Sequence, residues 1–327
     1  MHMTSEAEPV TAGVVGVGEM GQHHARVYDT LPGVDLVGVY DDDTDRATEI
    51  AKTHRTSVMA LESLLDRVDL ASIVVPTQYH YEVAMQAIEH GVDILVEKPL
   101  VSDQRQGADL IEQATERGVI IQVGHIERFN PAIQTLHRVI EDEELIGIET
   151  RRLGPPRDRM IDDTVVTDLM VHDIDVALSL VDGEVESVSA MSPYASRPDA
   201  VNDYTTATLQ FTDGTTVSHI ASRTTQKTTR ELTVTTRTKV IEVRYLDQHV
   251  EIYRKSDPAY VQDDGAVRYR EQTTVEVPFV DTEEPLVNEL QSFVDTVRTG
   301  GEPVVSATTG LTVVELAQQI EQEVLAT

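Results

Sequence analysis

The sequence predicts an α/β domain built on a doubly wound parallel sheet, followed by an α+β domain with an antiparallel sheet. In the first part of the chain, short apolar runs alternate with amphipathic helical stretches, as in a parallel sheet joined by right-handed helical crossovers. In the second part, strand-like runs follow one another without helices between them, which indicates antiparallel pairing. We place the first domain at residues 1–124 and the second at residues 125–327, whose C-terminal helices can pack back on the first domain.

The apolar runs of the first domain are rich in Val and Ile, as expected of strands buried on both faces. The predicted strands are Val10–Val17, Val34–Tyr40, Leu70–Val75, Asp93–Val96 and Val119–Val123. The predicted helices between them include Met20–Tyr28, Asp45–Thr53, Tyr81–Glu89 and Gln104–Glu116. Gly91 and Gly118 follow the last two helices and are typical helix-stop residues.

The second domain is predicted to be mostly strands, several of which alternate polar and apolar residues. These strands are Val185–Met191, Thr205–Phe211, Thr216–Ser222, Leu232–Thr236, Val240–Tyr245, Val250–Tyr253 and Thr273–Val277. Asp213-Gly214 lies between two of them and is a strong hairpin signal. The tail returns to helix at Pro285–Arg298 and Thr309–Leu325, with Gly300, Gly301 and Pro303 between the two helices.

Composition excludes several classes of function. The chain of 327 residues has no cysteine, which excludes disulfides, thiolate nucleophiles and cysteine metal sites. Its formal charge of −31, from 57 acidic and 26 basic residues, argues against nucleic acid or an anionic membrane as a partner. Many acids, few lysines and no tryptophan are typical of proteins adapted to high salt, so we expect a halophilic source. The polar, acidic start does not resemble a signal peptide, and we expect a cytoplasmic protein.

A glycine turn directly follows the first predicted strand and opens the first helix. It reads Gly16-Val17-Gly18-Glu19-Met20-Gly21. The first glycine permits a tight turn, the second lets a pyrophosphate approach the backbone, and the third lets the helix pack close to the strand. The helix N-terminus then offers free N–H groups to the phosphates. We therefore predict a Rossmann fold with a dinucleotide bound at residues 16–21, including Glu19 and Met20.

Asp41 ends the second predicted strand, 20 positions after Gly21. A carboxylate there can accept hydrogen bonds from both ribose hydroxyls and repels a 2′-phosphate. The neighbouring Asp42 and Asp43 add negative charge. We therefore expect NAD rather than NADP. The alternative is that the glycines form an ordinary turn and Asp41 is a loop acid.

Lys98 follows the fourth predicted strand within Glu97-Lys98-Pro99. Ligands bind at the carboxyl edge of open α/β sheets, so this lysine can lie near a nicotinamide and hydrogen-bond a substrate hydroxyl. The alternative is a solvated surface lysine. The chain has only five lysines, which makes one that follows a buried strand of interest.

Asp168 and His172 are four positions apart, a spacing that places both side chains on one face of a helix. A carboxylate beside an imidazole orients the ring and suits it to general acid–base catalysis. The alternative is an ordinary ion pair on a helix surface. A metal site is a third possibility, but the sequence offers no clear cluster of further ligands, and we predict none.

With these segments in view, the chain resembles the Gfo/Idh/MocA oxidoreductases along nearly its whole length. The matching segments are the glycine turn, residues 76–80 (PTQYH), Glu97-Lys98-Pro99 and the Asp168…His172 pair. The resemblance implies that Lys98, Asp168 and His172 are catalytic. It also implies that Pro76, Thr77, His80 and Glu97 line the cofactor, that the Lys98–Pro99 bond can be cis, and that the second domain has an open-faced sheet used for oligomerisation. We expect a homodimer or homotetramer.

A narrower resemblance is to the archaeal and bacterial UDP-N-acetylglucosamine 3-dehydrogenase group. It rests on residues 124–131 (GHIERFNP), 154–157 (GPPR) and 171–175 (VHDID). From it we expect His125, Arg128, Asn130 and Arg157 at the substrate, with Arg128 and Arg157 on the pyrophosphate. Two departures are residues 235–239 (TTRTK), where a glycine turn is usual, and Met170, where small residues are usual.

The reaction that this resemblance implies is oxidation of a sugar secondary hydroxyl to a ketone, at C3 of a UDP-N-acetylhexosamine. His172, oriented by Asp168, would take the hydroxyl proton, and Lys98 would stabilise the developing alkoxide. One alternative is a dehydrogenase of free polyols or sugars, of the inositol or glucose type. Another is a non-catalytic regulator that binds NAD and a sugar, although such proteins tend to lose the lysine or the histidine.

Overall fold

The structure, a computed structural model, describes residues 8–156, 164–193, 202–255, 259–263, 266–270 and 272–326. Residue contacts divide the chain into two compact units. The first unit comprises Met1–Phe129 and Glu284–Glu315, and the second comprises Asn130–Glu283 and Leu316–Thr327.

The first unit is built on a six-stranded sheet with the order β3-β2-β1-β4-β5-β6. All neighbouring strands are parallel. The strands are β1 (Val10–Val15), β2 (Val34–Tyr40), β3 (Ser57–Val58), β4 (Leu70–Ile73), β5 (Asp93–Glu97) and β6 (Ile121–Gly124). The chain progresses outward from β1 in one direction and from β4 in the other. The predicted doubly wound Rossmann sheet is therefore confirmed, with its switch point between β1 and β4.

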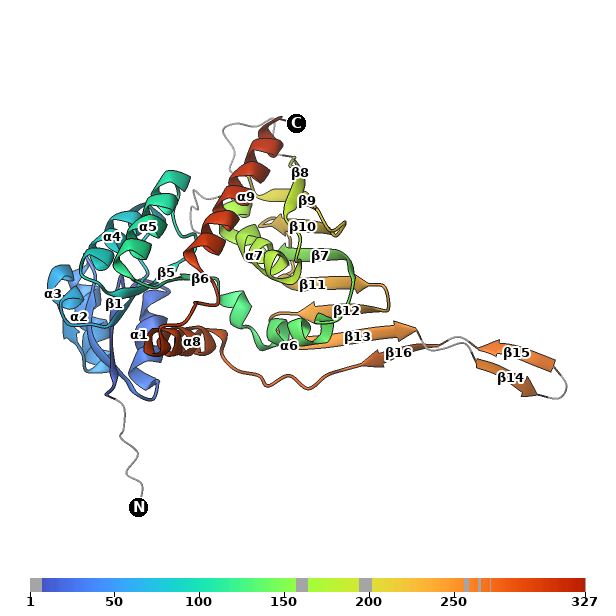
Figure 1. The fold of residues 1–327 in the computed structure, drawn as a ribbon, viewed down its shortest axis with the longest axis horizontal. Coiled ribbons are helices and arrows are strands. Elements are labelled where there is room, and N and C mark those ends of the chain that lie inside the picture. Colours follow the sequence, from blue (N-terminus) through green and yellow to red (C-terminus); the bar gives the residue numbers. More distant parts are fainter. Residues whose placement is uncertain are drawn as a thin grey trace, which may run out of the picture. The chain divides into compact units, whose positions relative to one another are not determined.

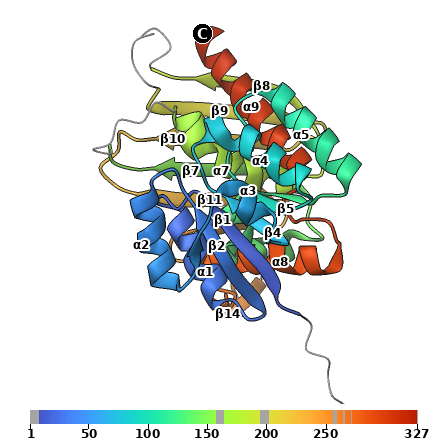
Figure 2. The ribbon, with the colours of Figure 1, turned by 90° about the vertical axis from the view of Figure 1, so that its left-hand side faces the viewer.

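Helices cover both faces of this sheet (Figures 1 and 2). One face packs against α3 (Leu61–Leu65), α4 (His80–Glu89) and α5 (Gln104–Arg117), through residues such as Leu64, Ile88 and Leu110. The other face packs against α1 (Gly21–Thr30), α2 (Thr44–His54) and α8 (Pro285–Thr299). Figure 1 shows α8, in red, beside α1, in blue, although they come from opposite ends of the chain. Burial on both faces explains why these strands are uniformly apolar.

The second unit contains an eight-stranded sheet with the order β16-β13-β12-β11-β7-β10-β9-β8. Its strands are β7 (Leu145–Leu153), β8 (Val185–Met191), β9 (Tyr204–Phe211), β10 (Thr216–Ser222), β11 (Thr229–Thr236), β12 (Lys239–Arg244), β13 (His249–Lys255) and β16 (Thr273–Glu276). Every neighbouring pair is antiparallel except β7 and β10, which are parallel. The sheet is therefore mixed. Along the chain, α7, β8 and β9 lie between β7 and β10. A separate ladder pairs β14 (Ala259–Asp263) with β15 (Ala266–Arg270).

Helix α6 (Pro131–Ile140) packs against β12 and β13 of this sheet, and α7 (Val171–Leu180) packs against β7 and β10. Side chains on the strands alternate between buried and more exposed positions, as in the buried Ile148, Thr150 and Arg152 of β7. A short π-helical turn, η3 (Val166–Met170), leads into α7. The last helix, α9 (Ala307–Ala326), contributes residues up to Glu315 to the first unit and later residues to the second.

Turn chemistry closes the predicted hairpins. Gly214, with φ of 94°, links β9 to β10, as Asp213-Gly214 predicts. The turn between β11 and β12, within residues 235–239, contains no glycine, and the Thr236 side chain closes it instead. The Thr236 hydroxyl accepts hydrogen bonds from the backbone N–H groups of Thr238 (3.2 Å) and Lys239 (3.1 Å). No helix in the described part of the chain is both long enough and apolar enough to span a bilayer.

Candidate active site

The glycine turn lies between β1 and α1 and depends on two of its glycines for steric reasons. Gly16 has φ of 86°, and a Cβ on it would lie 2.6 Å from the carbonyl oxygen of Val74. A Cβ on Gly21 would lie 1.9 Å from the carbonyl oxygen of Gly16. A Cβ on Gly18 would instead meet no atom closer than the Arg46 guanidinium, at 3.9 Å. Gly16 and Gly21 therefore form the turn, whereas Gly18 leaves open space beside it.

Asp41 connects the end of β2 to this turn. Its Oδ2 accepts a hydrogen bond of 2.7 Å from the Val17 N–H, and its Oδ1 accepts one of 2.9 Å from the Asp43 N–H. Each carboxylate oxygen has two lone pairs, so these bonds orient the group without exhausting its acceptor capacity. Glu19 and Met20 are exposed at the start of α1.

The residues that follow β4, β5 and β6 lie at one edge of the sheet, since the three strands are parallel neighbours. Pro76 and Thr77 follow β4 and begin the short helix η1 (Thr77–Tyr79). Lys98 follows β5, is half-buried, and donates its N–H to Glu97 Oε2 at 3.2 Å. The Lys98–Pro99 bond is cis, as the resemblance implies.

Glu97 belongs to a buried polar chain that the sequence did not predict. Its Oε1 lies 3.1 Å from Nε2 of His24 in α1. Nδ1 of His24 lies 3.0 Å from Ser72 Oγ, which is 2.9 Å from the hydroxyl of Tyr28. Burial alone would raise the pKa of Glu97, but the hydrogen bond and charge of His24, together with Lys98, hold it below its ordinary value. Glu97 is therefore an anion directly beside Lys98.

His80 links the loop that follows β4 to the loop that follows β5. Its Nδ1 lies 2.9 Å from the carbonyl oxygen of Pro99, and its Nε2 lies 2.9 Å from that of Val75. Burial lowers the pKa of His80, and the two carbonyl contacts only partly offset this effect. His80 is 1% exposed. The observed role of His80 is to hold the loop after β4 against the cis proline, and its contact with cofactor stays a prediction.

These features fit a dinucleotide. Gly18 leaves space where a pyrophosphate would approach the N-terminus of α1, and a Cβ at Gly16 or Gly21 would destroy the turn. Asp41 offers carboxylate oxygens at the end of β2, where ribose hydroxyls bind in this fold. The residues that would hold NAD are therefore the predicted Gly16, Gly18, Gly21 and Asp41.

In the second unit, Asp168 lies in η3 and His172 lies in the first turn of α7. The i, i+4 spacing predicts one continuous α-helix, but Asp168 is in a π-helical turn. Val166, Leu169 and Met170 of this turn are buried. Four residues are close to one turn of either helix type, so Asp168 and His172 still lie along one side.

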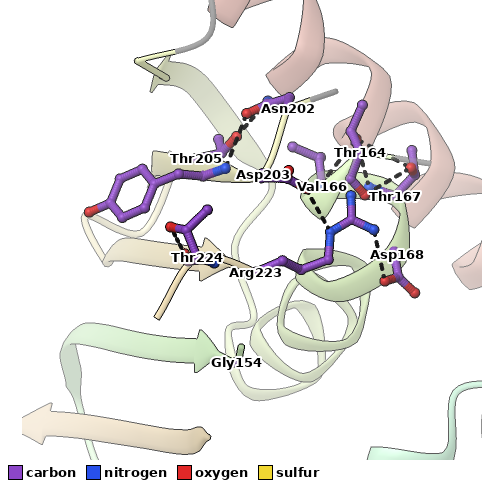
Figure 3. Close-up of polar contacts among 12 residues, drawn as sticks. Gly154, Thr164, Val166, Thr167, Asp168, Asn202, Asp203, Thr205, Arg223 and Thr224 are labelled. Carbon is purple, nitrogen blue, oxygen red and sulfur yellow. Dashed lines mark hydrogen bonds and ion pairs between the residues drawn. The ribbon is translucent and has the colours of Figure 1, made fainter. Parts of the chain in front are cut away.

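Two arginines that the sequence did not single out anchor this helical segment to the sheet. Arg152 of β7 forms a bidentate pair with Asp173 of α7, with both N···O distances 2.9 Å. Arg223, which follows β10, lies between Asp168 and Asp203 (Figure 3). Neither arginine carries a local motif, because each is explained only by a carboxylate far away in the sequence.

Three of the four predicted substrate residues lie in the described part of the chain. His125 follows β6 and is buried in the first unit, where Arg128 donates to the carbonyl oxygen of Val304 at 3.4 Å. In the second unit, Asn130 begins α6: its Oδ1 accepts from the Ala132 N–H at 3.1 Å, and its Nδ2 donates to the Tyr245 carbonyl at 3.2 Å. Asn130 therefore has a structural role. Arg157 lies outside the described residues.

Comparison with known proteins decides the family. A family model for the NAD-binding Rossmann fold of oxidoreductases matches residues 10–125, and a GFO/IDH/MocA C-terminal domain model matches residues 149–242. The UDP-N-acetylglucosamine 3-dehydrogenase of Acidithiobacillus ferrooxidans is 35% identical over 74% of this chain and 76% of its own length. The chain belongs to the GFO/IDH/MocA oxidoreductase family.

Other GFO/IDH/MocA relatives extend the likeness to polyol enzymes. The NAD-dependent scyllo-inositol 2-dehydrogenase of Bacillus subtilis is 30% identical over 91% of this chain and 89% of its own length. The solved structure of the A. ferrooxidans enzyme superposes with a TM-score of 0.87 and 30% identity, covering 97% of this chain and 98% of the other. Membership of the GFO/IDH/MocA family makes the chain an NAD-binding dehydrogenase of CH–OH groups, of the sugar and polyol class.

Proposed function

We propose that this protein oxidises the C3 hydroxyl of a UDP-N-acetylhexosamine to a ketone, with NAD as the hydride acceptor. The observation that carries the proposal is the likeness to the A. ferrooxidans UDP-N-acetylglucosamine 3-dehydrogenase, in sequence over 74% of this chain and in fold over 97%. The segments 124–131 and 171–175, on which the narrower resemblance rests, point to the same group.

Oxidation of a secondary hydroxyl removes one proton and one hydride. NAD, when bound, accepts the hydride. His172 is the proposed base that takes the hydroxyl proton, and Asp168 is the group that orients its ring. The position of both residues at the junction of η3 and α7 supports a pair that acts together.

Lys98 is proposed to donate a hydrogen bond to the same oxygen and to stabilise the negative charge that develops on it. Its backbone N–H donates a hydrogen bond of 3.2 Å to Glu97 Oε2. The anionic Glu97 keeps positive charge favourable at Lys98, which suits a group that must remain a donor.

Arg128 and Arg157 are the proposed contacts to the substrate pyrophosphate, since a guanidinium binds phosphate oxygens bidentately. Replacing Arg157 by Ala should raise KM for a UDP-sugar far more than for a free sugar. Equal effects on both substrates would remove this part of the proposal.

A free polyol is the second candidate substrate, because the B. subtilis inositol enzyme matches over most of both chains. The test measures NADH formation with UDP-N-acetylglucosamine, UDP-N-acetylgalactosamine, myo-inositol and scyllo-inositol. We expect kcat/KM for a UDP-N-acetylhexosamine to exceed that for either inositol by at least about tenfold, a difference of about 1.4 kcal/mol. The reverse order would make the protein a polyol dehydrogenase.

The proposed catalytic roles have matched controls in the chain. Lys98→Met and His172→Asn should lower kcat by about a hundredfold or more, whereas Lys52→Met changes an exposed lysine of α2 and should leave kcat unchanged. If NAD binds and no substrate yields NADH, the protein is a regulator rather than an enzyme.

A further inference from the structure

Arg223 is a buried cation that contacts the proposed catalytic segment from a different part of the sheet. It directly follows β10 and is 5% exposed. Its Nε donates to Asp203 Oδ1 at 3.0 Å, and its Nη1 lies 3.5 Å from Asp168 Oδ2. Figure 3 shows the guanidinium between the two carboxylates. The backbone N–H of Arg223 also donates to the Asp203 carbonyl oxygen at 2.9 Å.

The two contacts of Arg223 differ in strength. A guanidinium stays protonated in proteins, and burying it is costly unless carboxylates face it. The bond to Asp203 has ordinary hydrogen-bond length, whereas 3.5 Å to Asp168 is an ion-pair distance. Asp203 therefore fixes the guanidinium, and the guanidinium attracts Asp168 without taking all of its acceptor capacity.

The segment that carries Asp203 also holds the start of the π-helical turn. The carbonyl oxygen of Asn202 accepts from the Val165 N–H at 2.9 Å. Inside the turn, the Thr164 hydroxyl accepts from the N–H groups of Val166 (3.2 Å) and Thr167 (3.3 Å). The short segment Asn202–Asp203 therefore contacts both the backbone at the start of η3 and the Arg223 guanidinium that faces Asp168. π-Helical turns are rare and often occur at functional sites.

We propose that Arg223, held by Asp203, is a positioning residue that sets the place and the field of the Asp168 carboxylate for His172. The proposal rests on the proposed function of the Asp168–His172 pair and adds a group to it. Among the described residues, other charged groups near this segment include Glu321 of α9, which accepts from the Thr164 hydroxyl, the Arg152–Asp173 pair of β7 and α7, and the buried Asp175 of α7.

The charges around Asp168 determine the direction in which each substitution should change the pKa of His172. The positive charge of Arg223 offsets the attraction of the carboxylates for a protonated imidazole. Removing it should favour protonated His172 and raise the pKa of the ring, which makes the base less available near neutral pH. Removing the negative charge of Asp203 should have the opposite effect.

The experiment is an NMR titration of the His172 ring in the full protein, assigned by comparison with His172→Gln. It is made for wild type, Arg223→Met, Arg223→Lys and Asp203→Asn. We expect the titration midpoint to rise in Arg223→Met, to fall in Asp203→Asn and to stay near wild type in Arg223→Lys, which keeps the charge. Arg237→Met, at an exposed arginine that pairs with Glu144, is the matched control and should leave the midpoint unchanged.

Kinetics on the substrate that the wild type oxidises give a second readout. Arg223→Met should lower kcat by about tenfold with KM changed less than about twofold, because the group acts on the base and not on the bound sugar. Arg223→Lys should recover part of this loss. If Arg223→Met does not fold, Asp203→Asn, which conserves the shape of the side chain, still carries the test through the expected fall in the titration midpoint.

The outcomes separate the two proposals. If Asp168→Asn leaves the titration of His172 unchanged, the proposed Asp168–His172 pair fails. If Asp168→Asn shifts it but Arg223→Met and Asp203→Asn do not, the pair stands and the positioning role of Arg223 is overturned.

Discussion

Oε1 of Glu97 lies 3.1 Å from Nε2 of His24, so a buried ring in the first helix holds the carboxylate that precedes Lys98. His24 is fully buried, and the Glu97 side chain is 14% exposed. The pair extends through Ser72 to Tyr28, whose pKa is raised by burial, so its phenol remains a hydrogen-bond donor. The loop that bears Lys98 is therefore attached to the interior of the sheet by a chain of polar contacts.

Replacing His24 by Ala should destabilise the protein by about 2 kcal/mol near neutral pH, because the buried carboxylate of Glu97 loses its partner. The pKa of Glu97 is depressed in the folded state. Its contribution to stability is therefore complete above its ordinary value of 4.5 and is lost as the pH falls through the folded value. The difference between wild type and His24→Ala should shrink over that acid range.

The measurement for this pair is the free energy of unfolding in urea at several pH values. Glu97→Gln and the double variant complete a double-mutant cycle. Additive losses, or a difference between wild type and His24→Ala that does not depend on pH, would contradict the interaction.

The glycine turn gives a prediction in which two similar substitutions have different consequences. Gly21→Ala should prevent stable folding of the first unit, because its Cβ would lie 1.9 Å from the Gly16 carbonyl oxygen. Gly18→Ala should leave the stability of the ligand-free protein unchanged, because its Cβ meets no atom within 3.9 Å. It should nevertheless weaken NAD binding by about tenfold or more, since the pyrophosphate must approach the backbone there.

Thermal unfolding with and without NAD distinguishes these effects. Gly18→Ala should have the melting temperature of the wild type without NAD and a smaller increase with it. A large loss of stability in the ligand-free Gly18→Ala protein would show that the turn has less space than its geometry indicates.

Asp41 should control the choice between NAD and NADP. Its carboxylate is oriented by the N–H groups of Val17 and Asp43, and it would repel a 2′-phosphate. We expect Asp41→Ala to lower the ratio of kcat/KM for NAD to that for NADP by about tenfold or more. Asp35→Ala is the matched control and should leave the ratio unchanged, because Asp35 is an exposed acid near the opposite end of β2. An unchanged ratio in Asp41→Ala would remove the role of this carboxylate.

The fold class could be predicted because the periodicity of strands and helices is a local property of the sequence. Strand β7 was not predicted, for a physical reason. Its inward positions include Arg152, which interrupts the apolar pattern of a buried strand. The charge is tolerated there only because Asp173, 21 positions later, forms a bidentate pair with it. Strand β3 was missed because it has only two residues, both exposed.

The same distinction between local and distant interactions applies to the residues of the candidate site. The glycine turn, Asp41, Lys98 and the Asp168…His172 spacing are visible because each is a short motif beside a recognisable element. His24 and Arg223 are not visible, because their partners lie 73 and 55 positions away. Hydrogen bonds and ion pairs between distant segments depend on the tertiary fold, and sequence spacing carries no signal for them.

Salt should stabilise this protein. A formal charge of −31 makes net repulsion oppose the compact state. Salt weakens both this repulsion and the exposed ion pairs such as Arg237–Glu144, but such pairs contribute little, so relief of repulsion should win. The Debye length falls from about 10 Å at 0.1 M salt to about 3 Å at 1 M. We expect the melting temperature to rise over that range of KCl.

Guanidinium chloride at concentrations too low to unfold the protein is the control, because it screens charge without salting out apolar surface. A rise with both salts identifies screening as the cause, and a melting temperature that falls with KCl would contradict the prediction.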